Sequence, residues 1–346
     1  MAARAEAISA AATAALASAI STQWGTELGD ALTGTDKADH FFGRAGADTI
    51  DGGAGNDLLR GGDGGDILSG GVGVDTLWGD LGADQLSGGI YGDELHGGYG
   101  FDRLFGDAGN DLLDGGEQND QLTGDTGKDT LIGGGGDDRM FGGAGADSLT
   151  VGSGNDFARG GDGNDVLTDD GSSAGNDRMY GDAGADTLTG GNGADTLVGG
   201  YGNDVIRDVW VKDASGNLVA DDAALIDAGV GHDTIFASGA DTITTGAGLD
   251  VIVIGAAGET ALALSADVTV TDFMAGRDVL QFDLSNGGVA DALTLSLRLE
   301  DGNTIIVVTD AEGTSHDAVT LLDVTGATLD QLVEDYSFGT AAADLI

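Results

Sequence analysis

The chain has 346 residues, a formal net charge of −47 and 66 glycines, and it contains neither proline nor cysteine. A balance of 60 acidic to 13 basic residues repels phosphate, which argues against nucleic acid and anionic membrane surfaces as partners. The lack of cysteine excludes disulfides and thiolate metal sites, and no apolar run approaches the ~20 residues that span a bilayer.

In chain order, an Ala-rich segment over residues 1–33 predicts a partly helical N-terminus, and a nine-residue period then runs over residues 34–254. Asp recurs at every ninth position from Asp39 to Asp165 and again from Asp177 to Asp204. Degenerate units follow at Asp233, Asp241 and Asp250. Insertions interrupt the period near residues 169–173 and 208–226, and the second reads as a hairpin extruded from the repeat. Such a period predicts stacked structural units.

Most units have glycine two residues before their Asp and an apolar residue two residues after it, as Gly73 and Leu77 stand around Asp75. The glycines permit backbone angles that a Cβ would obstruct, so a unit reads as a six-residue loop and a three-residue strand. So short a strand is stable only if coils stack about 4.8 Å apart. With two units per coil, Asp57 stacks over Asp75. The predicted fold is all-β, a right-handed parallel β-roll (a β-helix solenoid) built from nonapeptides.

The stacked carboxylates create an electrostatic problem. Two unit charges ~4.8 Å apart repel by about 1 kcal/mol in water. Summed over the repeats, this repulsion matches the ~5–15 kcal/mol that stabilises a whole domain, so the roll requires cations between its coils. Carboxylate and carbonyl oxygens, without histidine or cysteine, favour Ca²⁺ over transition metals and over Mg²⁺.

The units GGAGNDLLR, GGDGGDILS and GGNGADTLV resemble the repeats-in-toxin (RTX) nonapeptide GGxGxDxUx, the hemolysin-type calcium-binding repeat. The resemblance implies that several Ca²⁺ ions lie between stacked loops, bound by the repeat aspartates and by loop carbonyls. The aspartates implied as ligands are Asp48, Asp57, Asp66, Asp75, Asp84, Asp93, Asp102, Asp111, Asp120, Asp129, Asp138, Asp147, Asp156, Asp165, Asp177, Asp186, Asp195, Asp204, Asp233 and Asp250. The glycines implied as ligands are Gly46, Gly55, Gly64, Gly73, Gly82, Gly100, Gly109, Gly127, Gly136, Gly145, Gly163, Gly184, Gly193 and Gly202.

Some units depart from the RTX pattern. Lys37, Tyr91 and Gln118 replace the glycine that precedes the Asp by two residues, and Val151 replaces the first glycine of its unit. These departures put in doubt the metal sites beside those loops.

Residues 255–346 alternate between polar and apolar side chains and predict antiparallel strands, with a short helix at 328–335. Asp301-Gly302-Asn303 predicts a hairpin. This block is placed to form a C-terminal antiparallel β cap over the last apolar layer. Within it, TDFMAGRDVLQFD resembles the segment that closes RTX arrays in proteins exported by type I secretion. That resemblance implies an uncleaved export signal around SFGTAAADLI, the type I secretion machinery as a partner and an extracellular location.

Catalytic motifs are weak. The zinc-protease motif HExxH is missing, and the G-x-S-x-G string at 171–175 lacks the strand–turn–helix context of a nucleophile. We therefore expect no enzyme activity. The expected function is that of a secreted protein that folds on binding Ca²⁺ and has a structural or adhesive role at the cell surface or in biofilm matrix, with surface polysaccharide or self-association as partners. The alternative is the C-terminal calcium-binding and secretion part of an extracellular hydrolase (a metalloprotease, a lipase or an alginate-modifying enzyme).

Overall fold

The computed structural model describes residues 21–169, 175–208, 223–254, 268–275, 277–283, 294–300, 303–309, 315–322, 324 and 333–337. These residues form strands joined by turns and bends, and none of the described ranges contains a helix that is long and apolar enough to cross a membrane. The chain divides into two compact units, residues 1–149 and 150–346, which are described separately.

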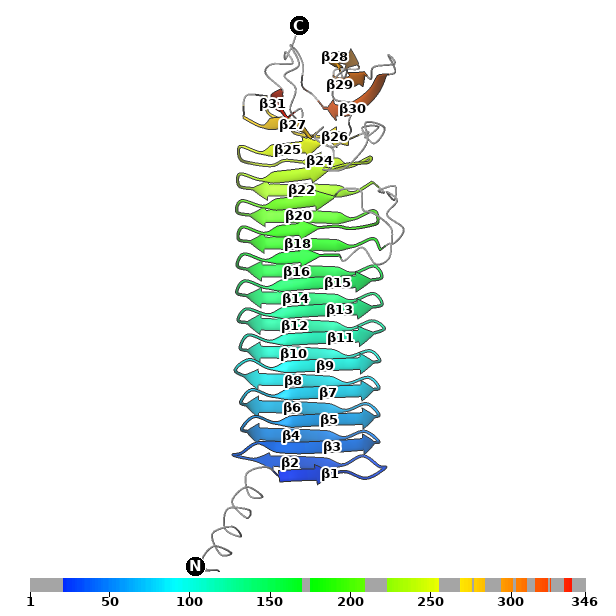
Figure 1. The fold of residues 1–346 in the computed structure, drawn as a ribbon, viewed down its shortest axis with the longest axis vertical. Helices are drawn as coiled ribbons and strands as arrows, with labels where there is room; N and C mark the ends of the chain where they lie inside the picture. Colours follow the sequence, from blue (N-terminus) through cyan, green and yellow to red (C-terminus); the bar gives the residue numbers. More distant parts are fainter. Residues whose placement is uncertain are drawn as a thin grey trace, which may run out of the picture. The chain divides into compact units, whose positions relative to one another are not determined.

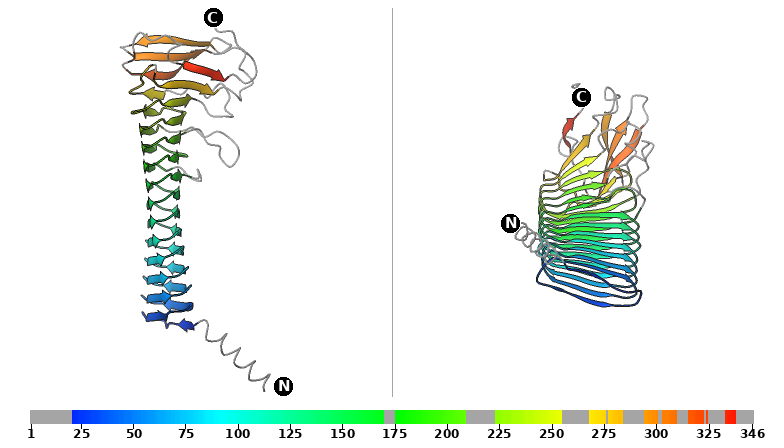
Figure 2. Two further views of the ribbon diagram at one scale, coloured as in Figure 1. Left: turned by 90° about the vertical axis from the view of Figure 1, so that its left-hand side faces the viewer. Right: turned by 60° about the horizontal axis from the view of Figure 1, so that its bottom comes forward.

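The first unit consists of short strands in two parallel sheets that face each other (Figures 1 and 2). Odd-numbered strands from β1 to β13 form one sheet and even-numbered strands from β2 to β14 form the other. The strands are β1 (Ser21–Trp24), β2 (Ala31–Thr35), β3 (Asp39–Ala45), β4 (Thr49–Ala54), β5 (Leu58–Asp63), β6 (Ile67–Val72), β7 (Thr76–Leu81), β8 (Gln85–Ile90), β9 (Glu94–Tyr99), β10 (Arg103–Ala108), β11 (Leu112–Glu117), β12 (Gln121–Thr126), β13 (Thr130–Gly135) and β14 (Arg139–Ala144). The unit boundary falls inside β15 (Ser148–Ser153).

The register confirms the predicted stacking of residues 18 apart. Leu59 pairs with Leu77 and Leu77 pairs with Leu95, one coil apart, in parallel strands. The apolar residue of each repeat points between the two sheets and is completely buried or nearly so. In the first unit this core consists of Phe41, Ile50, Leu59, Leu68, Leu77, Leu86, Leu95, Leu104, Leu113, Leu122, Leu131, Met140 and Leu149. One large side chain per repeat therefore fills the space between the sheets.

The strands are longer than the three residues predicted from the sequence. A typical strand such as β5 covers six residues, LLRGGD, and includes the glycine pair that the repeat pattern assigns to the loop. Gly62 and Asp63 still pair in register with Asp80 and Leu81 of the next coil. Because the glycines continue the parallel ladder, the connecting turn shrinks to three residues.

Strands occupy part of the segment over residues 1–33 that is predicted to be partly helical. Ser21–Trp24 forms β1, and Ala31 to Thr33 lie in β2. Both strands pair in parallel with the repeat strands, Trp24 with Phe42 and Leu32 with Ile50. The stacked strands thus begin before residue 34. Residues 1–20 lie outside the described part of the chain.

Up to β27, the strands of the second unit pair in parallel in an odd and an even series, and β28 to β31 depart from that alternation. They are β16 (Phe157–Asp162), β17 (Val166–Thr168), β18 (Arg178–Ala183), β19 (Thr187–Thr189), β20 (Thr196–Tyr201), β21 (Val205–Asp208), β22 (Leu225–Val230), β23 (Thr234–Ala237), β24 (Thr242–Thr244), β25 (Val251–Ile254), β26 (Val268–Val270), β27 (Val279–Asp283), β28 (Thr294–Glu300), β29 (Asn303–Thr309), β30 (Ser315–Leu321) and β31 (Val333–Ser337). The predicted extruded hairpin falls on residues 209–222, which are not among the described residues.

Antiparallel strands are present near the C-terminus, as predicted. Strand β28 pairs antiparallel with β29, with Glu300 opposite Asn303, which confirms the hairpin expected at Asp301-Gly302-Asn303. Strand β29 pairs antiparallel with β30, and β30 joins the roll through a parallel pairing with β26. Residues 333–335, expected to be helical, lie in β31, whereas 325–332 are outside the described ranges.

Candidate metal centre

The repeat aspartates form two rows, one along each edge at which a turn enters a strand. Asp57 immediately precedes β5 and Asp66 immediately precedes β6, in opposite sheets. All the aspartates expected as ligands are at most 3% exposed. Such burial of ionisable side chains is unusual, because a carboxylate is rarely buried without a partner.

A regular hydrogen bond joins many of the aspartates to the next one in their row, although Ala224 stands in the position one coil after Asp195. The backbone N–H of Asp57 donates to Asp75 Oδ1 at 2.7 Å, and Asp75 N–H donates to Asp93 Oδ1 at 2.8 Å. In the second unit the same bond spans the insertions: Asp156 N–H reaches Asp177 Oδ1 across 21 residues, at 2.8 Å. The predicted stacking of aspartates is therefore confirmed. The hydrogen bond fixes each side chain in one orientation.

The second carboxylate oxygen of each aspartate, Oδ2, takes no part in this hydrogen bond. Within the described residues, Oδ2 of many repeat aspartates is buried and accepts no hydrogen bond. These residues are Asp48, Asp57, Asp66, Asp75, Asp84, Asp93, Asp102, Asp111, Asp120, Asp129, Asp177, Asp186, Asp204, Asp233 and Asp250. Burial of an anionic oxygen without a hydrogen-bond partner costs free energy. A cation beside these oxygens would offset that cost.

The first glycine of each repeat provides space beside that oxygen. A Cβ placed on Gly70 would lie 2.5 Å from Asp75 Oδ2 and 2.7 Å from the carbonyl oxygen of Gly88 on the next coil. The carboxylate and the carbonyl thus converge on the same small volume, which only a glycine leaves open. Among the described residues, no three acidic or histidine side chains form a metal cage by themselves. Backbone carbonyls must therefore complete any ligand set.

The glycines predicted as ligands, two residues before each aspartate, line the turns. The carbonyl oxygen of Gly55 lies directly against the Cα of Gly73, and that of Gly64 against Gly82, so these carbonyls stack in a row along the turn edge. Most of these glycines have positive φ, for example 155° at Gly73. A side chain at such a position is excluded by the neighbouring turn as well as by the backbone conformation.

Two of the departures from the pattern keep the turn's backbone. Tyr91 and Gln118 adopt φ of 83° and 78°, the left-handed conformation of the glycines that they replace. A non-glycine residue in this conformation is strained. Asp93 and Asp120, which follow these turns, retain their hydrogen bonds from Asp75 and Asp102. The turns with Tyr91 and Gln118 thus preserve the aspartate row.

Burial raises the pKa of several aspartates of the rows above the ordinary 3.8 of an aspartic acid. Loss of hydration is the largest cause, the hydrogen bond from the preceding aspartate lowers the pKa, and repulsion by neighbouring carboxylates raises it further. The pKa of Asp75 rises to about 6, those of Asp84 and Asp93 to about 7, and that of Asp120 to about 8. Without a cation, ionising these groups therefore costs more free energy in the folded chain than in the unfolded one.

The sequence-based choice of ligands leaves out several aspartates, of which Asp30 is half-buried and the others are buried. Asp30 belongs to the row, since its N–H donates to Asp48 Oδ1 at 2.7 Å, and nine-residue spacing back from Asp39 could have found it. Asp241 accepts bonds from Ala224 and Ser238. Asp208 and Asp169 are also buried, yet they stand where the first glycine of a repeat normally occurs. No repeat signal could have identified these last two.

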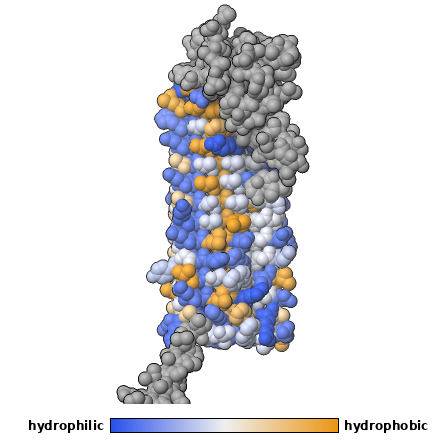
Figure 3. All heavy atoms as spheres, in the orientation of Figure 1, coloured by the Kyte–Doolittle hydropathy of each residue, from blue (hydrophilic) through white to orange (hydrophobic). Residues whose placement is uncertain are grey.

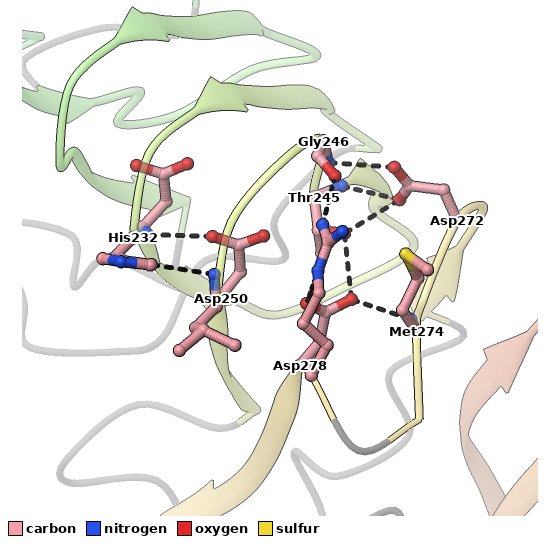
Figure 4. Close-up of polar contacts among 10 residues, drawn as sticks. His232, Thr245, Gly246, Asp250, Asp272, Met274 and Asp278 are labelled. Carbon is pink, nitrogen blue, oxygen red and sulfur yellow. Dashed lines mark hydrogen bonds and ion pairs between the residues drawn. The ribbon is translucent and has the colours of Figure 1, made fainter.

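A compact polar turn joins the last coils of the second unit (Figure 4). Asp272 accepts hydrogen bonds from the N–H groups of Thr245 and Gly246 at 2.7 and 2.9 Å. Asp278 accepts from Met274 N–H at 2.7 Å, and the Arg277 guanidinium donates to Gly246 O at 2.9 Å. Side chains of the segment DFMAGRD therefore hold it against the preceding coil through hydrogen bonds.

Replacement of Gly70 tests directly whether calcium-dependent folding needs the open space beside Asp75 Oδ2 and Gly88 O. We expect Gly70→Ala to raise the calcium concentration needed for folding about tenfold or more, because its Cβ would collide with Asp75 Oδ2 and Gly88 O, and overpacking of this kind costs about 1–3 kcal/mol. Gly65→Ala is the matched control, since the only atom within 4 Å of its Cβ is Ala83 O at 3.3 Å. Calcium titrations followed by circular dichroism measure the folding midpoint of both variants. Equal midpoints would contradict the assignment of the space beside Gly70 to calcium binding.

The fold and the donor set define a class: a parallel β-solenoid whose acidic nonapeptide turns accommodate hard cations with oxygen ligands. The family model of the RTX calcium-binding nonapeptide repeat matches residues 24–59, 60–90, 87–122, 114–149, 141–168, 150–173, 171–206 and 221–252. The chain therefore belongs to the RTX calcium-binding nonapeptide repeat family, and it binds multiple Ca²⁺ ions.

Two solved structures resemble the chain at low identity and low TM-score. A subunit of the mannuronan C5-epimerase from Azotobacter vinelandii is 22% identical, with a TM-score of 0.27, covering 50% of this chain and 86% of that chain. A hyperactive Ca²⁺-dependent β-helical antifreeze protein from an Antarctic bacterium is 19% identical, with a TM-score of 0.33, covering 75% of this chain and 85% of that chain. Neither likeness is close enough to transfer a function. Among curated proteins, no sequence matches the chain.

Proposed function

We propose that this protein is exported by a type I secretion machinery and folds outside the cell when Ca²⁺ binds along both rows of aspartates. The observation that carries the proposal is the series of buried Oδ2 atoms without hydrogen-bond partners in the described repeats. In this account the repeat aspartates supply carboxylate oxygens, and the turn glycines expected from the family pattern supply carbonyl oxygens. Bound Ca²⁺ supplies the positive charge that offsets the buried carboxylates.

The physical chemistry of the repeats supports folding after export. The low calcium concentration of the cytosol leaves weak sites empty, whereas extracellular modules bind with dissociation constants of about 10⁻⁴–10⁻³ M. Because the metal-free aspartates resist ionisation, the acidic chain stays unfolded until calcium is available. An unfolded chain is also the form that a secretion channel can pass.

Outside the cell, the proposed role is structural or adhesive, without catalysis. The RTX repeats account for the sequence between residues 24 and 252, apart from 207–220. Figure 3 shows apolar side chains in small patches among hydrophilic ones on the face in view, as expected of a surface exposed to solvent. The G-x-S-x-G string lies largely in residues 170–174, outside the described ranges. Hydrolysis of a standard protease, lipase or polysaccharide substrate by the intact chain would favour the alternative, a part of a secreted hydrolase.

Export can be tested with the full chain in cells that carry a type I secretion apparatus. We expect the protein in the medium, and we expect deletion of residues 337–346 to retain it in the cells. Deletion of residues 1–10 is the control of matched length and should leave export unchanged. Retention of the full chain, or equal export of both deletions, would contradict the proposed signal.

A further inference from the structure

A groove runs along the even-numbered sheet of the first unit, at the edge where the turns enter β6, β8, β10, β12 and β14. It has a volume of about 670 Å³, within the range of binding sites for small molecules. It crosses five successive coils, and four intervals of about 4.8 Å give it a length of roughly 19 Å. This shape suits a linear chain that lies along the stack of coils.

The groove presents polar side chains that the fold itself does not use. Gln85, Arg103 and Gln121 stand in register on three consecutive coils. Gln85 and Arg103 are exposed, and among the described residues none of the three side chains takes part in a hydrogen bond or ion pair. Together they offer amide and guanidinium donors, and the glutamines also offer acceptors. Such a column is matched by a ligand with a regular series of hydroxyl groups.

An aromatic ring completes the groove. Phe101, two residues before Arg103, is 61% exposed and lines the same groove. A large exposed aromatic side chain beside unpaired hydrogen-bonding groups is typical of a binding surface. The apolar face of a sugar ring packs on such an aromatic ring, while its hydroxyl groups reach the neighbouring polar side chains.

The charge of the protein and of the groove limits the kind of ligand that can bind. With the 20 aspartates of the predicted calcium sites neutralised by bound ions, 40 of the 60 acidic residues still face 13 basic ones, so the molecule as a whole repels a polyanion. The buried carboxylates that line the groove, Asp66, Asp84, Asp102 and Asp120, belong to the row assigned to calcium. Beyond that row the groove exposes two arginines, Arg103 and Arg139, and one acidic residue, Asp137, so the calcium-loaded groove does not favour a cationic ligand. An uncharged polymer is not subject to the repulsion that excludes a polyanion, nor to the effect that disfavours a cationic ligand. We propose that this groove binds a neutral linear polysaccharide, with Phe101 stacking on a sugar ring and Gln85, Arg103 and Gln121 bonding to its hydroxyl groups.

This inference rests on the proposed extracellular adhesive role and names its partner. The test is electrophoresis of the calcium-loaded full chain in native gels that contain hydroxyethyl cellulose, laminarin, galactomannan or dextran, with dextran sulfate as the anionic comparator. We expect at least one neutral polymer to slow migration. Phe101→Ala and Arg103→Ala should each weaken that retardation at least tenfold. Tyr99→Ala is the matched control, because Tyr99 is 59% exposed two residues away but lies on the opposite sheet.

Three results would each overturn the proposal. They are migration that no neutral polymer changes, retardation by dextran sulfate alone, and an equal loss of retardation in Tyr99→Ala. A dimer of the wild-type chain that Phe101→Ala dissociates would assign the groove to a second copy instead. Circular dichroism of the same samples with calcium monitors folding separately. Normal calcium-dependent folding without glycan binding would therefore refute the groove's assignment and leave the proposed calcium-driven folding intact.

Discussion

Without calcium, the chain should gain β-structure as the pH falls from 8 to 5. The folded-state pKa values of the buried aspartates lie at about 6 to 8, above the ordinary 3.8 that applies to the unfolded chain. Lowering the pH therefore protonates these groups first in the folded state, so stability lost above pH 8 returns as the pH falls towards 4. A carboxyl whose pKa rises to about 7 destabilises the ionised fold by roughly 4 kcal/mol, and Asp84, Asp93 and Asp111 all share that value. Three such groups are comparable with the ~5–15 kcal/mol stability of a domain.

Calcium should reverse the sign of this pH dependence. When the ion is bound, the carboxylates must be ionised, so protons compete with calcium and the apparent affinity falls between pH 8 and pH 5. Far-UV circular dichroism in EGTA and in millimolar calcium, at both pH values, measures the two trends. A metal-free chain that is more ordered at pH 8 than at pH 5 would contradict the assigned burial of the carboxylates.

Replacement of Asp75 should weaken calcium-dependent folding of the roll as a whole. Asp75→Ala removes a carboxylate from the row and leaves the N–H of Asp57 without its acceptor. Loss of an ionised hydrogen-bond acceptor costs about 1.5–3 kcal/mol, so the calcium midpoint should rise about tenfold or more. Asp75→Asn keeps an oxygen that can accept from Asp57 but removes the charge. It should therefore bind calcium less tightly than the wild type and yet lose less order in EGTA.

The matched control is Asp63→Ala. Asp63 is an exposed aspartate at the end of β5, outside the buried row, so its loss should leave the calcium midpoint within about twofold of the wild type. Calcium titrations at pH 7.5 with a circular dichroism readout compare the variants. If Asp63→Ala and Asp75→Ala shift the midpoint equally, net charge rather than the buried row governs folding.

Much of this architecture is encoded in the spacing of a few residues. Asp57 and Asp75 are 18 residues apart, and each is followed by a leucine at the same offset, so this spacing alone predicts the parallel register of Leu59 with Leu77. The hairpin at Asp301-Gly302-Asn303 is equally predictable, since a two-residue turn needs residues of this kind.

Other features depend on tertiary context that no local pattern carries. The alanines of the N-terminal segment favour a helix, but Ser21–Trp24 and Ala31 to Thr33 at its end pair with the first repeat strands and lie in strands themselves. The sequence indicates repulsion between stacked carboxylates, whereas in the structure loss of hydration is the larger effect on the pKa of Asp75 and Asp84. Depth of burial cannot be read from spacing. Asp208 likewise gives no signal, because it replaces a glycine that the pattern expects.

The most direct measurement is far-UV circular dichroism of the purified chain at pH 8, first in millimolar Ca²⁺ and then after stripping with excess EGTA, with small-angle scattering for compactness. Bridging of the buried aspartates by calcium predicts a strong β-sheet signal that collapses on chelation, expansion of the chain, and recovery of both when calcium is restored. An unchanged spectrum and unchanged dimensions in EGTA would show that the carboxylate rows are stable without the ion and would contradict the account.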